Sequence, residues 1–251
     1  MPYVDRDGVA IYYEDHGSGP PVLLTHGYAA SSRMWAGQVE AFANRYRLLT
    51  WDMRGHALSD SPESQAAYSE AATVDDMAAI LDQCGVDEAV LGGHSLGGFM
   101  SLAFNLKYPE RVRALILLGT GPGYRNPTAR EGWNKNAEAR ARRFEEQGLE
   151  AATGTAEVRV SRHRSAEGLA RAARGMLAQF DSRVIESLPD ITVPTLILVG
   201  ADDEPFLNSS DYMAAKIPGA RKVIIPNAGH AANIDNPEAF NAAFEGFMAS
   251  L

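Results

Sequence analysis

The sequence predicts an α/β protein whose mostly parallel, twisted sheet carries helices on both faces. Short apolar runs alternate with stretches of helical spacing from residue 9 to residue 119. The alternation stops between residues 121 and 188, where no run is typical of a strand, and it resumes at residue 194. A tight, glycine-rich turn joins one of the strands to the helix after it, at residues 93–97. These observations indicate one sheet interrupted by a helical insertion.

Near-continuous apolar strands separated by helices are typical of a parallel sheet that is buried on both faces. The strands are expected at residues 9–13, 21–25, 46–51, 89–92, 114–119, 194–199 and 221–225. The helices of this part of the chain are expected at residues 32–43, 73–83, 99–107 and 237–248. The core of the protein would therefore consist of residues 1–120 and 189–251.

Residues 121–188 differ from the core in pattern and in charge. Gly121-Pro122-Gly123 breaks the chain, and two amphipathic helices follow. The apolar face of the first carries Trp133, Ala137 and Phe144, and that of the second carries Leu169, Ala173, Met176, Leu177 and Phe180. The segment has 12 basic and 9 acidic residues, a net charge of +3, whereas the remainder has a net charge of −12. We expect a separate helical unit here.

Composition excludes several classes of protein. The chain has 251 residues, which suits one large domain, and its net charge of −9 argues against a nucleic-acid partner. A single cysteine leaves no intramolecular disulfide. The N-terminal residues do not form a secretory signal, and no apolar run is long enough to span a bilayer. A cytoplasmic protein without a membrane partner is expected, while its oligomeric state is not predicted.

The turn Gly93-His94-Ser95-Leu96-Gly97 matches the pattern G-x-S-x-G between a strand and a helix. Such a turn is so sharp that the serine backbone adopts an unfavourable conformation and its neighbours must be small. The serine hydroxyl then lies at a helix N-terminus, where free N–H groups favour negative charge. Because so short a pattern also occurs by chance, a catalytic Ser95 needs a base and an acid elsewhere in the chain.

His230 is the candidate base. It follows the last strand and precedes the last helix, so it lies at the carboxyl edge of the sheet, where such sheets bind ligands. The side chain of His94 is expected to point away from Ser95, and His26 is expected to make a structural hydrogen bond at the end of a buried strand. His56 lies in a loop that could border the site.

The candidate acid follows the preceding strand, where the sequence reads Gly200-Ala201-Asp202-Asp203-Glu204. Asp203 is the preferred residue, and Asp202 is the alternative. The loop after the strand that ends at Gly119 is another place for the acid, but it contains no carboxylate. An acid here would orient the base.

Two backbone N–H groups are needed to stabilise an oxyanion. Leu96, the residue after the nucleophile, would donate one, and Tyr28 would donate the other. Gly27 gives the loop before Tyr28 the freedom to turn its amides inward. The alternative is that His26-Gly27 is only a turn at the end of a strand.

The chain order Ser95, Asp203, His230 on this pattern of strands and helices resembles the α/β-hydrolase superfamily. The resemblance covers essentially the whole chain and includes His26-Gly27, the loop 52–59, Gly200 to Asp203, and Gly229-His230. One position departs, since Ala57 stands where the family pattern Arg-Gly-x-Gly-x-Ser has its second glycine, which leaves the shape of that loop open. The C-terminal third is similar to bacterial cofactor-free esterases and enol-lactonases of the 3-oxoadipate type. The resemblance implies that residues 121–188 form a cap over the active site.

The nucleophile narrows the expected chemistry. Family members that open epoxides or displace halide use Asp where this chain has Ser95, so those activities are not expected. Serine suits acyl transfer through an acyl-enzyme, on a small carboxylic ester or lactone. Alternatives on the same triad are a C–C bond hydrolase, a thioesterase, a perhydrolase or a receptor-like ligand binder. No cofactor is expected, and no metal, because the histidines and acids lack the spacing of ligands.

The acyl pocket is expected to be apolar. Trp133, Met176 and Phe206, together with Tyr28, are its candidate lining residues, although helical spacing also explains Trp133 and Met176 as core. Three arginines of the cap are expected to form a solvated helix face, with the alternative that one of them binds an anionic substrate. They are Arg140, Arg142 and Arg143.

Overall fold

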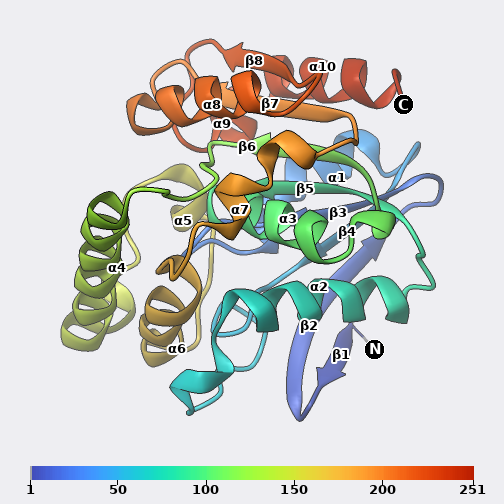
Figure 1. Ribbon diagram of the computed structural model, residues 1–251. Helices are drawn as coiled ribbons and strands as arrows, with labels where there is room; N and C mark the ends of the chain where they lie inside the picture. The colour runs from blue at the N-terminus through green and yellow to red at the C-terminus, as the bar shows by residue number, and fades with distance from the viewer. Residues whose placement is uncertain (1) are drawn as a thin grey trace.

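The computed structural model describes residues 2–251 and contains one eight-stranded sheet in the order β1-β2-β4-β3-β5-β6-β7-β8. Six neighbouring strands are parallel: β4, β3, β5, β6, β7 and β8. The other two, β1 and β2, add an antiparallel edge. This α/β architecture confirms the predicted fold class (Figure 1). The strands are β1 (Tyr3–Arg6), β2 (Val9–His16), β3 (Pro21–Thr25), β4 (Arg47–Trp51), β5 (Ala89–His94), β6 (Val112–Leu118), β7 (Thr195–Gly200) and β8 (Arg221–Ile225).

Helices cover both faces of the sheet because each strand in its centre has apolar side chains on both sides. All residues of β5 and β7 are buried. One face packs against α2 (Glu70–Gln83), α3 (Leu96–Lys107) and α8 (Glu204–Lys216). The other face packs against α1 (Ala36–Phe42), α9 (Ala232–Asp235) and α10 (Pro237–Met248), where Phe42 and Phe244 stack with ring centroids 4.8 Å apart.

The segment 121–188, here called the cap, contains helices and no strand in the part of the chain that the structure describes. Its helices are α4 (Pro127–Gln147), α5 (Ala156–Arg159), α6 (Ala166–Ala172), a π-helical turn (Ala173–Leu177) and α7 (Arg183–Glu186). α4 and α6 lie side by side at the left of Figure 1. The cap is not isolated from the sheet, since Phe144 and Leu169 belong to the same apolar cluster as α2 and α3.

Three expectations from the sequence differ from the structure. β1 was not expected, because it is a short edge strand with exposed residues, and α8 was not expected, because its side chains are mixed in polarity. Phe180 does not share the apolar face of α6: it is 70% exposed, because the chain leaves the helix at Ala178 in an extended conformation.

Candidate active site

Ser95 lies at the turn between β5 and α3 and has φ 51° and ψ −116°, a strained conformation for a side chain with a Cβ. The glycines two residues before and after it have no room for a side chain. A Cβ on Gly93 would lie 2.2 Å from the carbonyl carbon of Gly97, and a Cβ on Gly97 would lie 2.3 Å from the carbonyl oxygen of Thr25. The packing therefore explains the glycines of the G-x-S-x-G pattern and places Ser95 at the first turn of α3.

His230 and Asp203 meet at the same edge of the sheet. Nδ1 of His230 donates a hydrogen bond to Oδ2 of Asp203 at 2.9 Å, which leaves Nε2 available. Asp203 is buried at the beginning of α8, whereas Asp202 is exposed. The ring of Phe206 stacks on His230 with centroids 4.7 Å apart and fixes the plane of the imidazole.

One cavity of about 760 Å³ connects these residues. Ser95, Asp203 and His230 line it from the core, and Tyr28 and Leu96 lie beside the serine. Trp133 and Phe206, two of the candidate lining residues, lie on its wall. Met176 does not, because its side chain is 1% exposed and packs inside the apolar cluster beneath the cap.

The two candidate oxyanion donors have free N–H groups. Among the loop and side-chain hydrogen bonds of residues 2–251, none uses the N–H of Tyr28 or of Leu96. The phenol of Tyr28 donates to the carbonyl oxygen of Leu169 at 3.0 Å, which ties the loop after β3 to α6. The backbone arrangement suits two donors beside Ser95.

Two buried histidines and a half-buried one hold that loop in place. His26 donates from Nδ1 to the carbonyl oxygen of Gly27 at 2.7 Å and accepts from the N–H of Met53 at 2.9 Å. His56 accepts from the N–H of Ala29, and His163 of the cap bonds to the carbonyl oxygen of Ala29. Burial lowers the pKa of His26 to about 3 and the pKa values of the other two below the ordinary range, so all three are neutral. His56 therefore supports the site from outside the cavity wall.

Ala57 adopts a backbone conformation that favours glycine. Its φ is 38°, in the left-handed region. The cap binds this residue on both sides, since its N–H donates to Nδ1 of His163 at 3.2 Å and its carbonyl oxygen accepts from Nε of Arg164 at 2.9 Å. The contacts with the cap therefore hold Ala57 in a strained backbone conformation.

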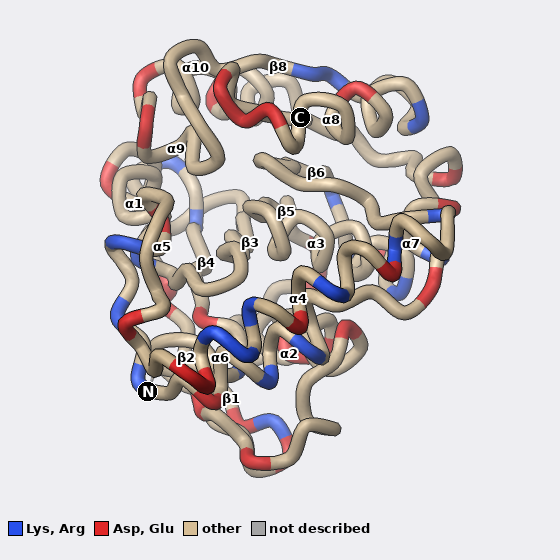
Figure 2. Tube along the Cα trace, turned by 90° about the vertical axis from the view of Figure 1, so that its left-hand side faces the viewer, with Lys and Arg blue, Asp and Glu red and all other residues tan. Residues whose placement is uncertain are grey.

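The arginines of α4 divide between the surface and the cavity. Arg142 forms an ion pair with Glu138 on the outer face of the helix. Arg140 and Arg143 line the cavity, although both side chains are largely exposed. Basic and acidic stretches alternate along α4 at the front of Figure 2.

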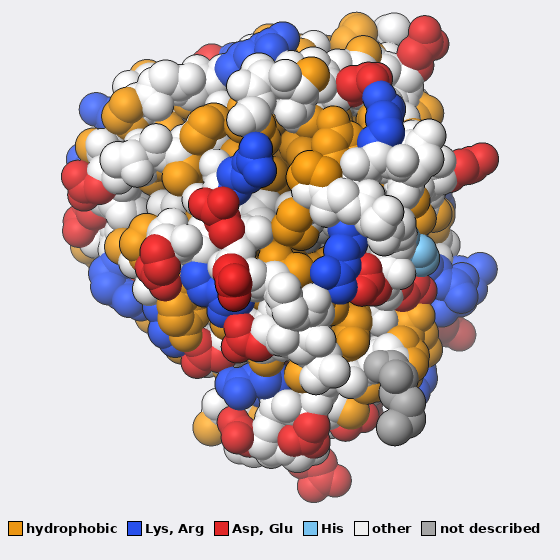
Figure 3. Space-filling view, turned by 90° about the vertical axis from the view of Figure 1, so that its right-hand side faces the viewer, with side chains coloured by type: hydrophobic (Ala, Val, Ile, Leu, Met, Phe, Trp, Pro, Cys, Tyr) orange, Lys and Arg blue, Asp and Glu red, His pale blue; other side chains and the backbone are white. Residues whose placement is uncertain are grey.

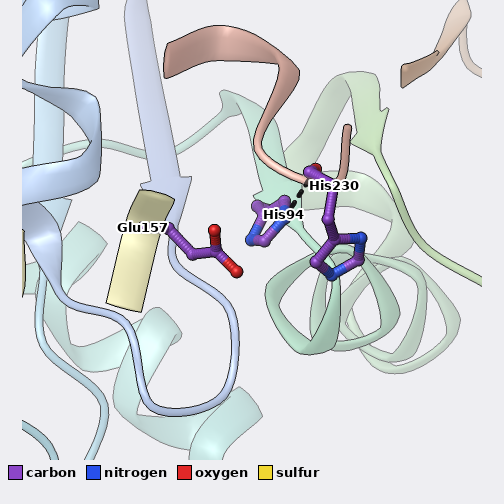
Figure 4. A group of neighbouring side chains, drawn as sticks. All are labelled: His94, Glu157 and His230. Atoms are coloured by element: carbon purple, nitrogen blue, oxygen red, sulfur yellow. Dashed lines mark hydrogen bonds between the residues drawn. The ribbon is translucent and has the colours of Figure 1, made fainter. Parts of the chain in front are cut away.

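A buried acid of the cap lies beside the histidines, and the sequence analysis missed it. Glu157 of α5 is 3% exposed and lines the cavity. One atom each of His94, Glu157 and His230 lies within 4.8 Å of the others, and Figure 4 shows the carboxylate directed toward the ring of His94. Spacing along the chain gave no signal for this group, because 63 positions separate His94 from Glu157 and only the folding of the cap brings them together.

Comparison with known proteins gives the family. A family model described as alpha/beta hydrolase fold matches residues 20–167, more than half of the chain. This chain belongs to the α/β-hydrolase family. No helix in residues 2–251 combines the length and the apolar character that a membrane span requires.

Several hydrolases are similar to this family member over nearly its whole length. It is 31% identical to a putative carbamate hydrolase RutD of Azorhizobium caulinodans, over 100% of this chain and 99% of the relative. It is 27% identical to 3-oxoadipate enol-lactonase 1 of Acinetobacter baylyi, over 98% and 96%. A malate-bound thermophilic esterase from Thermogutta terrifontis superposes with a TM-score of 0.84 at 29% identity, over 100% and 97%. Relatives of these kinds indicate a hydrolase that resembles esterases and lactonases.

Proposed function

We propose that this protein is a serine hydrolase that cleaves a small carboxylic ester or lactone through an acyl-enzyme. The observation that carries the proposal is the 2.9 Å hydrogen bond between His230 and Asp203, in the same cavity as a strained serine at the beginning of a helix. The esterase and lactonase names of similar proteins support the substrate class. The cap, residues 121–188, would close the cavity over the acyl group.

In the proposed mechanism, Nε2 of His230 accepts the proton of Ser95 while Oγ attacks the carbonyl carbon of the substrate. The N–H groups of Tyr28 and Leu96 stabilise the oxyanion of the tetrahedral intermediate. Asp203 holds the imidazole in the tautomer with a proton on Nδ1 and stabilises the imidazolium. The alkoxide leaves with the proton from Nε2, and water then hydrolyses the acyl-enzyme.

The cavity fits such a substrate because its wall has an apolar part and a basic part. Trp133, Phe206 and Phe99 supply apolar surface for an acyl chain. Arg140 and Arg143 lie at exposed positions of the same cavity, where they would bind an anionic end of a longer substrate. We infer a small, largely apolar acyl group next to the scissile bond.

The direct test is the variant Ser95→Ala with p-nitrophenyl acetate. Removal of the nucleophile is expected to lower kcat/KM by about 10⁴-fold or more. A fluorophosphonate should add one mass equivalent to the wild type on Ser95 and none to the variant, while circular dichroism shows equal folding. Hydrolysis by Ser95→Ala at the wild-type rate would overturn the proposal.

A further inference from the structure

Three acceptor atoms near Ser95, on His94, Glu157 and His230, have no hydrogen-bond donor. Nε2 of His94 donates to the carbonyl oxygen of His230 at 3.0 Å, so Nδ1 of the neutral ring carries a lone pair. That Nδ1 atom and Oε2 of Glu157 are both buried, and neither has a hydrogen-bond partner. Nε2 of His230 is the third acceptor, because Nδ1 is engaged by Asp203. Unpaired buried acceptors of this kind usually mark the place of an ordered water.

The size of the gap suits one water-sized donor. One ring nitrogen of His94, one ring nitrogen of His230 and one carboxylate oxygen of Glu157 lie no more than 4.8 Å apart, and no ion pair joins Glu157 to either ring in residues 2–251. A donor oxygen about 2.9 Å from two acceptors at the tetrahedral angle separates them by about 4.7 Å. A Zn²⁺ ion with bonds of about 2.0–2.1 Å needs its ligands about 3.4 Å apart, so the side chains would have to move inward.

The proposed reaction favours water over an ammonium group or a metal ion as the donor at this place. Nε2 of His230 must be free to take a proton from Ser95, so a resident ammonium group or metal ion there would block the proposed reaction. In the acyl-enzyme, Oγ of Ser95 is esterified and Nε2 of His230 has no donor of its own. A water molecule at this place can donate one hydrogen bond to Nε2 of His230 and a second to Oε2 of Glu157, a carboxyl oxygen without another donor.

We propose that Glu157 is a positioning residue that holds the water for deacylation against His230. The proposal rests on the acyl-enzyme of the proposed function. The water oxygen bonds to the acyl carbon as its proton passes to Nε2 of His230, and the bond between that carbon and Oγ of Ser95 then breaks as Nε2 returns the proton to Oγ. The carboxylic acid leaves, and Glu157 accepts a hydrogen bond throughout without taking the proton.

The fixed position of Glu157 supports this role. Its other oxygen, Oε1, accepts from the hydroxyl of Thr155 at 2.5 Å. The carbonyl oxygen of Glu157 accepts from Ser161, whose hydroxyl accepts from Ser31 in the loop after β3. The cap thereby holds one carboxylate oxygen over the catalytic histidine while the other is anchored.

The test separates the two half-reactions. Glu157→Leu removes the acceptor, so with p-nitrophenyl acetate the steady-state kcat should fall about 10–100-fold, the equivalent of one hydrogen bond to a charged group. The rate of the initial burst of p-nitrophenol should stay within twofold of the wild type. Intact-protein mass spectrometry should then show acetylated enzyme accumulating in the variant. The kcat of Glu157→Gln, which keeps a neutral acceptor of the same shape, should lie between those of the wild type and Glu157→Leu.

Glu150→Gln is the matched control, because Glu150 is an exposed acid of the cap outside the cavity wall, and it should change neither phase. An equal loss of burst rate and kcat in Glu157→Leu, or no loss of kcat, would overturn the role in deacylation. Zn²⁺ binding by calorimetry that Glu157→Gln abolishes, with unchanged deacylation, would assign the three acceptors to a metal instead. Absence of Ser95-dependent hydrolysis and of acylation on Ser95 in the wild type would refute the proposed function itself.

Discussion

Ser95, Asp203 and His230 come from the core, whereas Glu157, Arg140 and Arg143 come from the cap, and the two sets are held by different forces. The core residues depend on packed glycines, buried strands and neutral histidines. The outer face of the cap depends on exposed ion pairs, such as those of Arg174 with Glu138 and Glu145. Figure 3 shows the side of the molecule away from α4, where acidic and basic side chains are scattered between apolar ones.

The contrast between core and cap indicates which residues must be held in fixed positions. Buried contacts in a close-packed interior tolerate little displacement, whereas exposed ion pairs contribute only about 0–1 kcal/mol each and permit motion. Under the proposed function, the groups that react with the scissile bond come from the first kind of environment. The arginines that would bind an anionic substrate come from the second kind, whereas Glu157 belongs to the cap but is buried.

The largest expected effect concerns the acid of the core. Asp203→Asn should lower kcat/KM by about 10³–10⁴-fold, because an amide favours the wrong tautomer of His230. Asp202→Asn, a neighbour with an exposed side chain, should change it less than about twofold. Steady-state kinetics with p-nitrophenyl acetate measures both. Similar losses of kcat/KM in the two variants would contradict the choice of Asp203 over Asp202 as the acid.

The sequence could predict these core residues because local rules determine their place. A base and an acid at the ends of consecutive strands must meet at one edge of a parallel sheet. The same rules could not find Glu157, because its position depends on how α5 packs over the loop after β3. The same rules also misplaced Met176 and Phe180. Helical periodicity predicts which residues share a face of the helix, but it predicts neither what covers that face nor where the helix ends.

The second expected effect is a dependence of the core on pH. His26, His56 and His94 are buried and neutral, with pKa values lowered by burial, that of His26 to about 3. Unfolded histidines titrate near 6.5, so their contribution to stability is fully present above that pH and is lost as the pH falls toward the folded pKa. His26 alone should remove about 1.4 kcal/mol of the free energy of unfolding between pH 7.5 and 5.5.

Urea unfolding at pH 7.5, 6.5 and 5.5 measures this loss, and His26→Asn should reduce its slope by about one proton. The cap provides the contrast. Hydrogen bonds from Arg174 and Arg142 lower the pKa of Glu138 to about 2, so Glu138→Gln should leave the slope in this range unchanged. Equal unfolding free energies of the wild type at all three pH values would contradict the neutral histidines.

The smallest expected effect lies where the two regions touch. Ala57→Gly should raise the free energy of unfolding by about 0.5–1 kcal/mol, because glycine adopts a φ of 38° without strain and this gain exceeds its extra entropy in the unfolded chain. Ala249→Gly, at an exposed alanine with a φ of −69°, should instead lower it slightly. Thermal and urea unfolding measure both variants. Destabilisation by Ala57→Gly would mean that the bonds to His163 and Arg164, rather than backbone strain, dominate this junction of core and cap.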